Sequence, residues 1–160
     1  MPLYLIAAIM WLAPGLPHEK VQQYADLIHF EAMWYRVDPL VLVSLIQVES
    51  RWNTRKRSVT NDFGLGQIHV AKRGSGDFYG REKMLYNPRV NIREAARIAA
   101  MWREYHTKWC RGAHPYWAHY KYGKRVKADI SHAIKVKALL DLLRKKFRPN
   151  RPVPVAQPNA

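Results

Sequence analysis

Acidic residues are scarce in this chain of 160 residues, which has 12 Asp and Glu against 27 Lys and Arg. The formal net charge is +15 at pH 7. An excess of this size favours an anionic partner, such as nucleic acid, an anionic lipid surface or an acidic envelope polymer. Charge alone does not choose among these partners. The length suits one compact domain with some tail at either end, and we expect a monomer.

Cysteine is nearly absent as well, since Cys110 is the only one. A lone cysteine excludes an intramolecular disulfide and a thiolate metal cluster, and we expect neither a metal nor a cofactor. Cys110 lies near His106 and His114 in the sequence. A nucleophilic thiol is therefore one interpretation, and an ordinary semi-buried thiol is the other.

Long hydrophobic runs are also lacking. The apolar run from Leu3 to Ala13 is far too short to span a bilayer as a helix. Its length is typical of the hydrophobic region of a secretory signal, although no Lys or Arg precedes it. We expect residues 1–17 to be a signal peptide or short anchor, residues 18–147 the folded domain, and residues 148–160 a flexible Pro-rich tail. The alternative for residues 1–17 is an N-terminal element that packs on the domain.

Hydrophobic periodicity predicts a mainly α domain with little or no β-sheet. Residues 18–36 form an amphipathic pattern. Asp38-Pro39 then starts a second helix, which is apolar from Leu40 to Val48 except at Ser44 and Gln47, as expected of a helix in the middle of a domain. Further helices are predicted after Asn91 as N-cap, over 116–122 and over 126–147. Polar and glycine-containing loops separate them.

Glu49 lies where the apolar second helix meets the polar turn 50–53. Cleavage of a glycosidic bond needs a proton on the bridging oxygen, and an ordinary carboxylate holds none at neutral pH. A carboxyl group whose charged form is poorly solvated keeps its proton. The position of Glu49 therefore fits a general acid at the edge of a cleft. The alternative is a Glu that simply begins a solvated turn.

Four segments resemble motifs of the soluble lytic transglycosylase (SLT) family in the lysozyme superfamily. The sequence VESRWN at 48–53 is similar to the family's ES-R-F-N, and GLGQI at 64–68 to G-L-M-Q-I. The preceding NDF at 61–63 is similar to the D-Y of variants linked to conjugation systems, invasion loci and phages. NPRVNI at 87–92 with Ala95-Ala96 resembles NP-x-x-NI-x-x-G-A, and HYKYG at 119–123 resembles A-Y-N-A-G. The segments occur in the family's order and cover about residues 20–125.

The resemblance implies a lysozyme-like helical domain with a substrate cleft, in which Glu49 is the catalytic acid and base. Ser50 would support Glu49 by hydrogen bonding, and the hydroxyl of Tyr120 would orient it. The turn that contains Leu65 and Ile68 would line the cleft. Its glycines, Gly64 and Gly66, would let the backbone approach the sugar, and Gln67 would bind an N-acetyl group or the glycan. Turn glycines, a solvated Gln and a core Tyr are the alternatives.

Two positions depart from the family's motifs. Lys121 replaces the expected Asn, with Tyr122 in place of a small residue, and Gly66 replaces the family's Met. The substitution at Lys121 affects the detail of one cleft wall. Gly66 removes a side chain that often lines the cleft.

The expected reaction is cleavage of the β-1,4 bond between N-acetylmuramic acid and N-acetylglucosamine in peptidoglycan, with formation of a 1,6-anhydro ring. Glycosidases ordinarily use two carboxylates, but here the substrate's 2-acetamido group would stabilise the developing cation. Hydrolysis by a muramidase, with Asp62 or a positioned water, is the alternative, and Asp62 could equally cap its turn. Such a substrate predicts a location in the bacterial periplasm, in the cell envelope or outside the cell, with a phage or secretion setting favoured.

A non-catalytic function is the competing class. The chain has no helix-turn-helix or RNA-binding signature, so we expect no nucleic-acid partner. Its basic residues are scattered and could bind anionic wall polymers, or a membrane surface through the basic C-terminal helix. A degenerate wall-binding domain is a further option, which only Lys121 supports.

Overall fold

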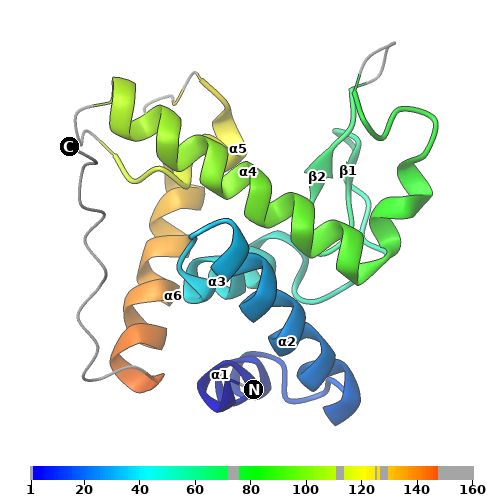
Figure 1. Ribbon diagram of the computed structural model, residues 1–160, viewed down its shortest axis with the longest axis vertical. Coiled ribbons are helices and arrows are strands. Elements are labelled where there is room, and N and C mark those ends of the chain that lie inside the picture. The colour runs from blue at the N-terminus through cyan, green and yellow to red at the C-terminus, as the bar shows by residue number, and fades with distance from the viewer. Residues whose placement is uncertain (1, 72–75, 111–113, 125, 127–129, 148–160) are drawn as a thin grey trace.

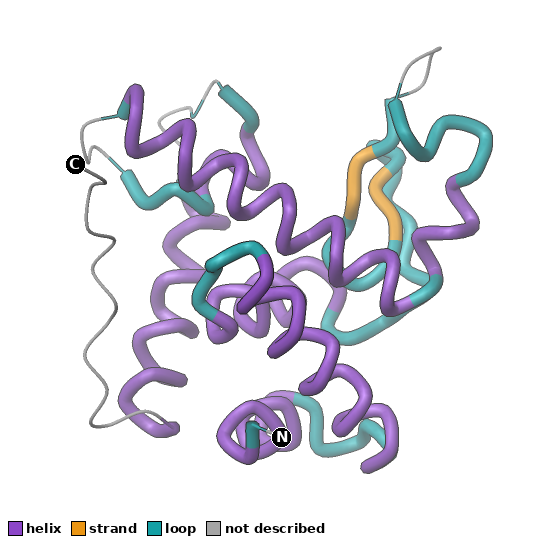
Figure 2. The backbone as a smooth tube through the Cα atoms, viewed as in Figure 1, coloured by secondary structure: helices purple, strands orange, loops and turns teal. Residues whose placement is uncertain are grey.

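The computed structural model describes residues 2–71, 76–110, 114–124, 126 and 130–147. Helices dominate these residues, and the one sheet among them is a two-stranded hairpin that pairs Asp62 with His69 and Phe63 with Ile68 (Figures 1 and 2). The prediction of a mainly α fold is confirmed. In chain order the elements are α1 (Leu3–Leu12), α2 (His18–Trp34), α3 (Pro39–Ser50), β1 (Asp62–Phe63), β2 (Ile68–His69), the 3-10 helix η1 (Glu82–Tyr86), α4 (Pro88–Trp109), α5 (Ala118–Tyr122) and α6 (Ser131–Phe147).

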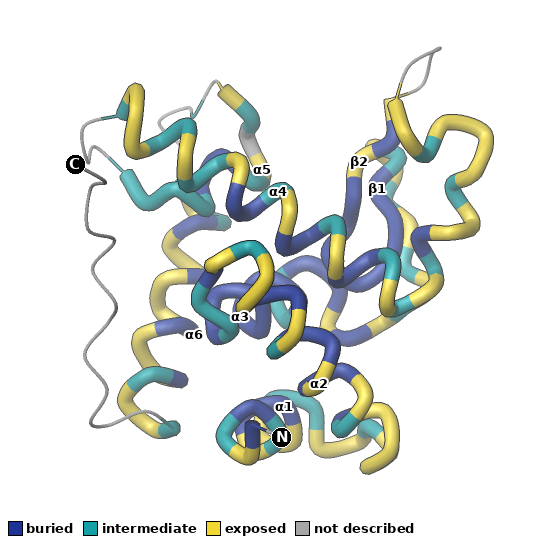
Figure 3. The backbone as a smooth tube through the Cα atoms, in the orientation of Figure 1, coloured by how far each residue is buried: buried dark blue, intermediate teal, exposed yellow. Residues whose placement is uncertain are grey.

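The helix α3 lies at the centre of the fold, packed against α1, α2 and α6 (Figure 1). Its start is fixed by Asp38, whose side chain accepts a hydrogen bond from the Leu40 amide at 3.0 Å, with Pro39 at the first helical position. Arg144 of α6 donates to the same carboxylate at 2.8 Å. Every residue from Leu40 to Ile46 is buried, which explains why the sequence there is apolar nearly all round (Figure 3).

The N-terminal helix α1 packs on the same core, against α2, α3 and α6. Leu5, Ala8 and Ile9 are completely buried, and the ring of Trp11 contacts that of Phe147 with centroids 6.4 Å apart. None of the described helices combines the length and the apolar character needed to cross a bilayer. The helix α1 is thus part of the hydrophobic core, and removal of residues 1–17 would uncover the buried faces of its three neighbours.

The start of α4 differs from the prediction. Asn87 is the N-cap, since its side chain accepts a hydrogen bond from the Arg89 amide at 2.9 Å. Asn91, predicted as the cap, is completely buried inside the helix. Its side chain accepts from the Gly66 amide at 2.6 Å and donates to the carbonyls of Phe63 and Leu85, both at 2.8 Å. The prediction was wrong because these buried loop groups need hydrogen-bond partners, which Asn91 supplies.

The helix α6 buries the apolar side that the sequence periodicity predicted. Its buried residues are Ala133, Val136, Leu140 and Leu143. The helix begins at Ser131, whereas the prediction placed its start at residue 126, and α5 is confined to Ala118–Tyr122. The predicted tail at 148–160 lies outside the described residues.

Candidate active site

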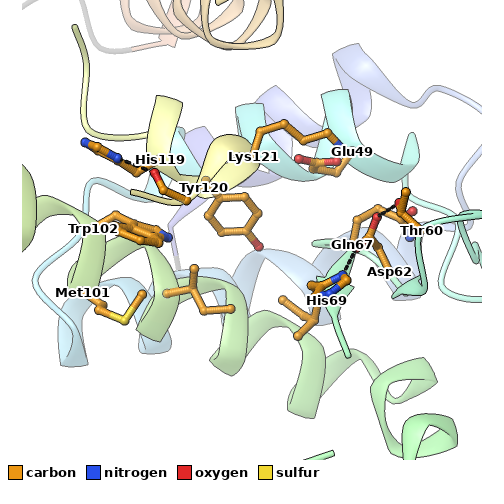
Figure 4. A pocket seen from close by; sticks show the side chains of 13 residues that line it. Glu49, Thr60, Asp62, Gln67, His69, Met101, Trp102, His119, Tyr120 and Lys121 are labelled. Carbon is orange, nitrogen blue, oxygen red and sulfur yellow. Dashed lines mark hydrogen bonds and ion pairs between the residues drawn. The ribbon is translucent and has the colours of Figure 1, made fainter. Parts of the chain in front are cut away.

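A cavity of about 540 Å³ lies where the end of α3 meets the β-hairpin, α4 and α5 (Figure 4). This volume is in the range of small-molecule sites. The cavity brings together predicted site residues from segments far apart in the chain. Its lining consists of Glu49, Thr60, Asp62, Gln67, Ile68, His69, Ile98, Met101, Trp102, His119, Tyr120, Lys121 and Gly123.

Glu49 reaches this cavity from the last turn of α3 and is 6% exposed. The chain leaves the helix through two residues with left-handed backbone conformations, Arg51 at φ 52° and Trp52 at φ 66°. Trp52 anchors this turn, because its indole N–H donates to Gln47 Oε1 at 2.6 Å and its ring stacks on Tyr24. A fixed helix end therefore presents the Glu49 carboxyl to the cavity.

Ser50 completes the end of α3 rather than contacting the Glu49 carboxyl. Its hydroxyl donates to the Ile46 carbonyl at 3.1 Å and accepts from the Trp52 amide at 3.1 Å. These bonds satisfy backbone groups at the helix terminus. The predicted support of Glu49 by Ser50 is thus indirect in this structure, through the backbone that carries both residues.

Tyr120 lines the cavity, but its hydroxyl donates to the Gly66 carbonyl at 2.9 Å. The predicted orienting bond to Glu49 is replaced by one that holds the Gly64–Ile68 turn. Burial, and next the charge of Glu49, raise the pKa of Tyr120 well above its ordinary value. The phenol therefore remains a hydrogen-bond donor.

The two glycines of this turn contact protein atoms, and neither lines the cavity. Gly64 has φ +73°, and a Cβ there would lie 2.3 Å from the Leu85 carbonyl oxygen. A Cβ on Gly66 would lie 2.8 Å from the Tyr120 hydroxyl and 2.9 Å from the Ala95 Cβ. The sequence predicted a close approach of the backbone to the sugar. The structure instead shows that the missing side chains let the turn pack against α4 and Tyr120.

The other residues of the turn divide between cavity and core. Gln67 and Ile68 line the cavity, whereas Leu65 is completely buried in the hydrophobic core. The Gln67 amide nitrogen donates to the carbonyls of Lys56 at 3.2 Å and Gly64 at 2.9 Å. Backbone contacts therefore fix the position of this side chain at the cavity wall.

Asp62 lies on the hairpin side of the cavity. Its Oδ2 accepts hydrogen bonds from the hydroxyls of Ser58 at 2.7 Å and Thr60 at 2.6 Å, and its Oδ1 lies 2.8 Å from His69 Nδ1. Burial raises the pKa of Asp62. The three hydrogen bonds and the charge of Lys121 lower it by more than burial raises it, so the pKa lies below its ordinary value. Asp62 is therefore held as a carboxylate with both oxygens engaged.

The assembled motif residues agree with a comparison to known families. Residues 26–125 match the family described as Transglycosylase SLT domain, over more than half of the chain. The chain belongs to the SLT transglycosylase family. This confirms the resemblance and supports, in general terms, a glycan-cleaving function of the lytic transglycosylase type on peptidoglycan. No match was found to a curated protein or to a solved structure.

His132 lies beside Glu49 but beyond the matched SLT region, and the sequence did not indicate it as a site residue. His132 Nε2 of α6 is 3.0 Å from Glu49 Oε1, with side-chain exposures of 14% and 7%. The distance is that of an ion pair or hydrogen bond, although the approach is poorly aligned, and neither ring nitrogen has another partner among the described residues. His132 precedes Val136 and Leu140 at four-residue steps. A polar residue on this apolar side was the available signal.

Lys121, the departure from the SLT motif, lies on the cavity lining. Its ammonium group helps to lower the pKa of Asp62. The family's Asn would carry no charge at this place. The substitution therefore adds positive potential to the wall that α5 forms, close to the carboxylate of the hairpin.

Proposed function

We propose that the chain is a lytic transglycosylase, which cleaves the β-1,4 bond between N-acetylmuramic acid and N-acetylglucosamine and closes a 1,6-anhydro ring on the muramic acid. The observation that carries this proposal is the buried carboxyl of Glu49 at the wall of the 540 Å³ cavity, in a chain of the SLT family. The cavity wall also contains Gln67 and Tyr120 from the other SLT motifs.

In the first step, neutral Glu49 gives its proton to the bridging oxygen, and the bond from this oxygen to the muramic C1 breaks. The carbonyl oxygen of the substrate's 2-acetamido group bonds to C1 and compensates the cation that develops there. Glu49 is now a carboxylate. In the second step the C6 oxygen attacks C1, the acetamido oxygen leaves, and Glu49 takes up the C6 hydroxyl proton. The acid is regenerated and no water is consumed.

His132 would act on this cycle through Glu49. His132 Nε2 lies 3.0 Å from Glu49 Oε1, so an N–H at this nitrogen would donate to Oε1 once aligned and leave Oε2 to hold the transferable proton. The same donor stabilises the carboxylate that exists between the two steps. We therefore assign His132 as a positioning residue of Glu49.

The remaining walls suit a sugar chain. Ile98, Met101 and Trp102 of α4 give the cavity an apolar side, while the hairpin and α5 supply polar groups. Gln67 uses its amide nitrogen for backbone contacts, so its amide oxygen is the atom offered to an N–H or hydroxyl of the glycan. This is the contact expected for an N-acetyl group.

Digestion of purified sacculi tests the proposal. The wild-type chain should reduce their turbidity and release muropeptides that carry 1,6-anhydromuramic acid, detected by mass spectrometry, whereas Glu49→Gln should release none. Soluble products with reducing muramic acid ends and without the anhydro mass would reject the transglycosylase reaction. An inactive wild type that still binds sacculi would indicate a wall-binding domain.

Asp62 gives one observation in favour of a muramidase. It lines the same cavity as Glu49 and is held ionised, as the second carboxylate of a hydrolase must be. Against this reading, both of its oxygens already accept hydrogen bonds from Ser58, Thr60 and His69. A carboxylate held in this way is a poor nucleophile and a good anchor for its turn, and we place hydrolysis second.

The proposed substrate implies a place of action in the bacterial envelope, and we infer delivery there in a phage or secretion setting. The charge of +15 would assist capture of anionic wall polymers. Binding of the Glu49→Gln protein to sacculi should then weaken as salt is raised. Leakage from anionic vesicles would instead identify the membrane surface as a partner of the basic α6.

A further inference from the structure

A second cluster of donor side chains lies beside the cleft, where α4 ends and α5 begins. One ligand atom each of Cys110, His114 and His119 lies within 4.8 Å of the other two. Cys110 is the C-cap of α4, and its sulfur is 3.3 Å from His119 Nε2. His119 is 1% exposed and stacks on Trp102, with ring centroids 5.1 Å apart (Figure 4). Packing thus holds the imidazole toward the sulfur.

The hydrogen bonds of the cluster leave one ring nitrogen of His119 and one of His114 available to a ligand. His119 Nδ1 is 2.7 Å from the Gly123 carbonyl oxygen, so Nδ1 carries the proton and Nε2 presents its lone pair toward Cys110. A metal-bound histidine typically donates its other N–H to a carbonyl in this way. His114 Nδ1 is buried and has no hydrogen-bond partner among the described residues. A buried ring nitrogen of this kind needs a partner.

We propose that Cys110, His114 and His119 bind a zinc ion. One thiolate and two imidazoles are donors that zinc accepts, and the fourth tetrahedral position is left to a water molecule or to His106, whose ring adjoins the cluster. Bonds of about 2.0–2.3 Å place tetrahedral ligand atoms about 3.3–3.8 Å apart. The distance of 3.3 Å from Cys110 Sγ to His119 Nε2 falls in this range, and all three ligand atoms lie within 4.8 Å of one another. The His106 ring lies 5.3 Å from that of His114 and 6.0 Å from that of His119, and its Nε2 contacts the His114 carbonyl.

The sequence pattern is compatible with this site. The three ligands follow one another as C-x3-H-x4-H, and His106 precedes Cys110 by one helical turn. The lack of further cysteines excludes a cluster of thiolates, but imidazoles replace thiolates in many zinc sites. The sequence offered no reason to expect a metal, because only His106 and His114 were expected near Cys110. The fold also brings His119 Nε2 to within 3.3 Å of the Cys110 sulfur, which the sequence does not show.

Zinc at this position would join the end of α4 to α5, the helix that carries Tyr120 and Lys121 into the cavity. The ion would fix one wall of the cleft and take no part in proton transfer at Glu49. The proposal therefore stands or fails independently of the transglycosylase reaction, and its test measures metal binding and thermal stability.

The chain of 160 residues is first treated with a chelator and a phosphine reductant, and the chelator is then removed. The metal-free chain is titrated with zinc in competition with a chromophoric chelator. We expect one zinc per chain, with release of protons as the thiol ionises. Cys110→Ala should weaken binding about 100-fold or more, since loss of an outer contact to a ligand alone costs about 10–100-fold. The matched control is His29→Gln, which removes another imidazole with a buried unpartnered nitrogen, in α2, and should bind zinc as the wild type does.

Two further measurements keep the test informative if a variant folds poorly. Cobalt(II) bound to the wild type should show a thiolate charge-transfer absorption that Cys110→Ala lacks. Zinc at about 100 times its Kd should raise the wild-type Tm by about 5 °C and leave that of Cys110→Ala unchanged. A wild-type chain that holds no more zinc than Cys110→Ala would overturn the proposal and leave a plain thiol–imidazole hydrogen bond.

Discussion

At the end of α3 the carboxyl of Glu49 contacts one imidazole, whereas on β1 the carboxyl of Asp62 is held by two hydroxyls and an imidazole. Their exposures are nearly equal, 6% and 7%, so burial does not distinguish the two acids. The difference lies in the hydrogen-bond donors around them. Three donors fix Asp62 as a carboxylate with a lowered pKa. Among the described residues, the second oxygen of Glu49 makes no hydrogen bond.

The contrast assigns different functions to the two sides of the cleft. In the proposed reaction, an acid that gives up and regains a proton needs one oxygen without other hydrogen bonds, and Glu49 Oε2 at the cavity meets this need among the described residues. An acid with both oxygens engaged holds its own loop together, as Asp62 does for residues 58–69. Two carboxylates in one cavity therefore do not by themselves indicate the two-carboxylate chemistry of hydrolases.

Replacing Glu49 with Gln should produce the largest effect. The change removes the transferable proton and little volume, so we expect cleavage of sacculi to fall about a thousandfold or more. Tm and binding to sacculi should stay near wild-type values, because the amide still fills the end of α3. Retention of a tenth of the activity would mean that the proton comes from another group, with Asp62 the first to examine.

His132 should come second. His132→Ala removes the group at 3.0 Å from Glu49 Oε1, and we expect kcat to fall about 10–100-fold with little change in KM, because a misplaced acid slows the chemistry more than binding. His132→Gln keeps an N–H donor and should recover part of the loss. Equal activities of the Ala and Gln variants, with both Tm values lowered, would show that His132 only packs α6 against α3.

The helical part of the fold was predictable because its signals are local. The apolar run from Leu40 to Val48 after Asp38-Pro39 marked α3, and periodicity marked the buried side of α6. The start of α4 was misplaced because Asn87 and Asn91 are both good caps by composition. Only the packing of the hairpin on α4 shows that Asn91 is required to satisfy the Gly66 amide and two carbonyls.

The residues that line the cavity were predictable where they belong to SLT motifs. Their contacts, and the cavity residues outside the motifs, were not. Glu49, Gln67 and Tyr120 line one cavity, as their motifs suggested. The contacts of Ser50, Gly66 and the Tyr120 hydroxyl were misjudged, because motif positions do not show whether a residue faces the substrate or its neighbours. His132 could not be placed beside Glu49 without knowing how α6 crosses α3.

Replacing Asp62 with Asn should affect stability more than catalysis. We expect activity to fall about tenfold at most, with reducing and anhydro products in unchanged proportion, and stability to fall by about 1–3 kcal/mol through weakened hydrogen bonds. A loss of activity as large as that of Glu49→Gln would establish Asp62 as a second catalytic carboxylate and favour the muramidase reaction.

The pH dependence of this stability loss has a definite sign. The folded-state pKa of Asp62 lies below its unfolded value, about 3.9. The contribution of its charge is therefore fully present above that value and is lost as the pH falls through the lower folded pKa. Urea denaturation at a series of pH values should show a constant difference between wild type and Asp62→Asn from pH 7 to about 5, shrinking below about 4. A difference that already declines near pH 6 would contradict the lowered pKa.

Lys121→Asn restores the family's residue. Of the four variants, it should change activity and stability least. Loss of the ammonium group raises the folded-state pKa of Asp62 toward its ordinary value. The acid-induced loss of stability should therefore begin at the same pH as in the wild type, but be smaller and end at a higher pH. Activity should change by about fivefold at most, as expected for a solvent-exposed charge. Lys124→Asn, an exposed lysine outside the cavity lining, is the matched control and should leave the pH profile unchanged. If Lys121→Asn instead abolished cleavage while Asp62→Asn did not, the ammonium group would have to act on the glycan directly, and the α5 wall would join Glu49 as part of the reacting centre.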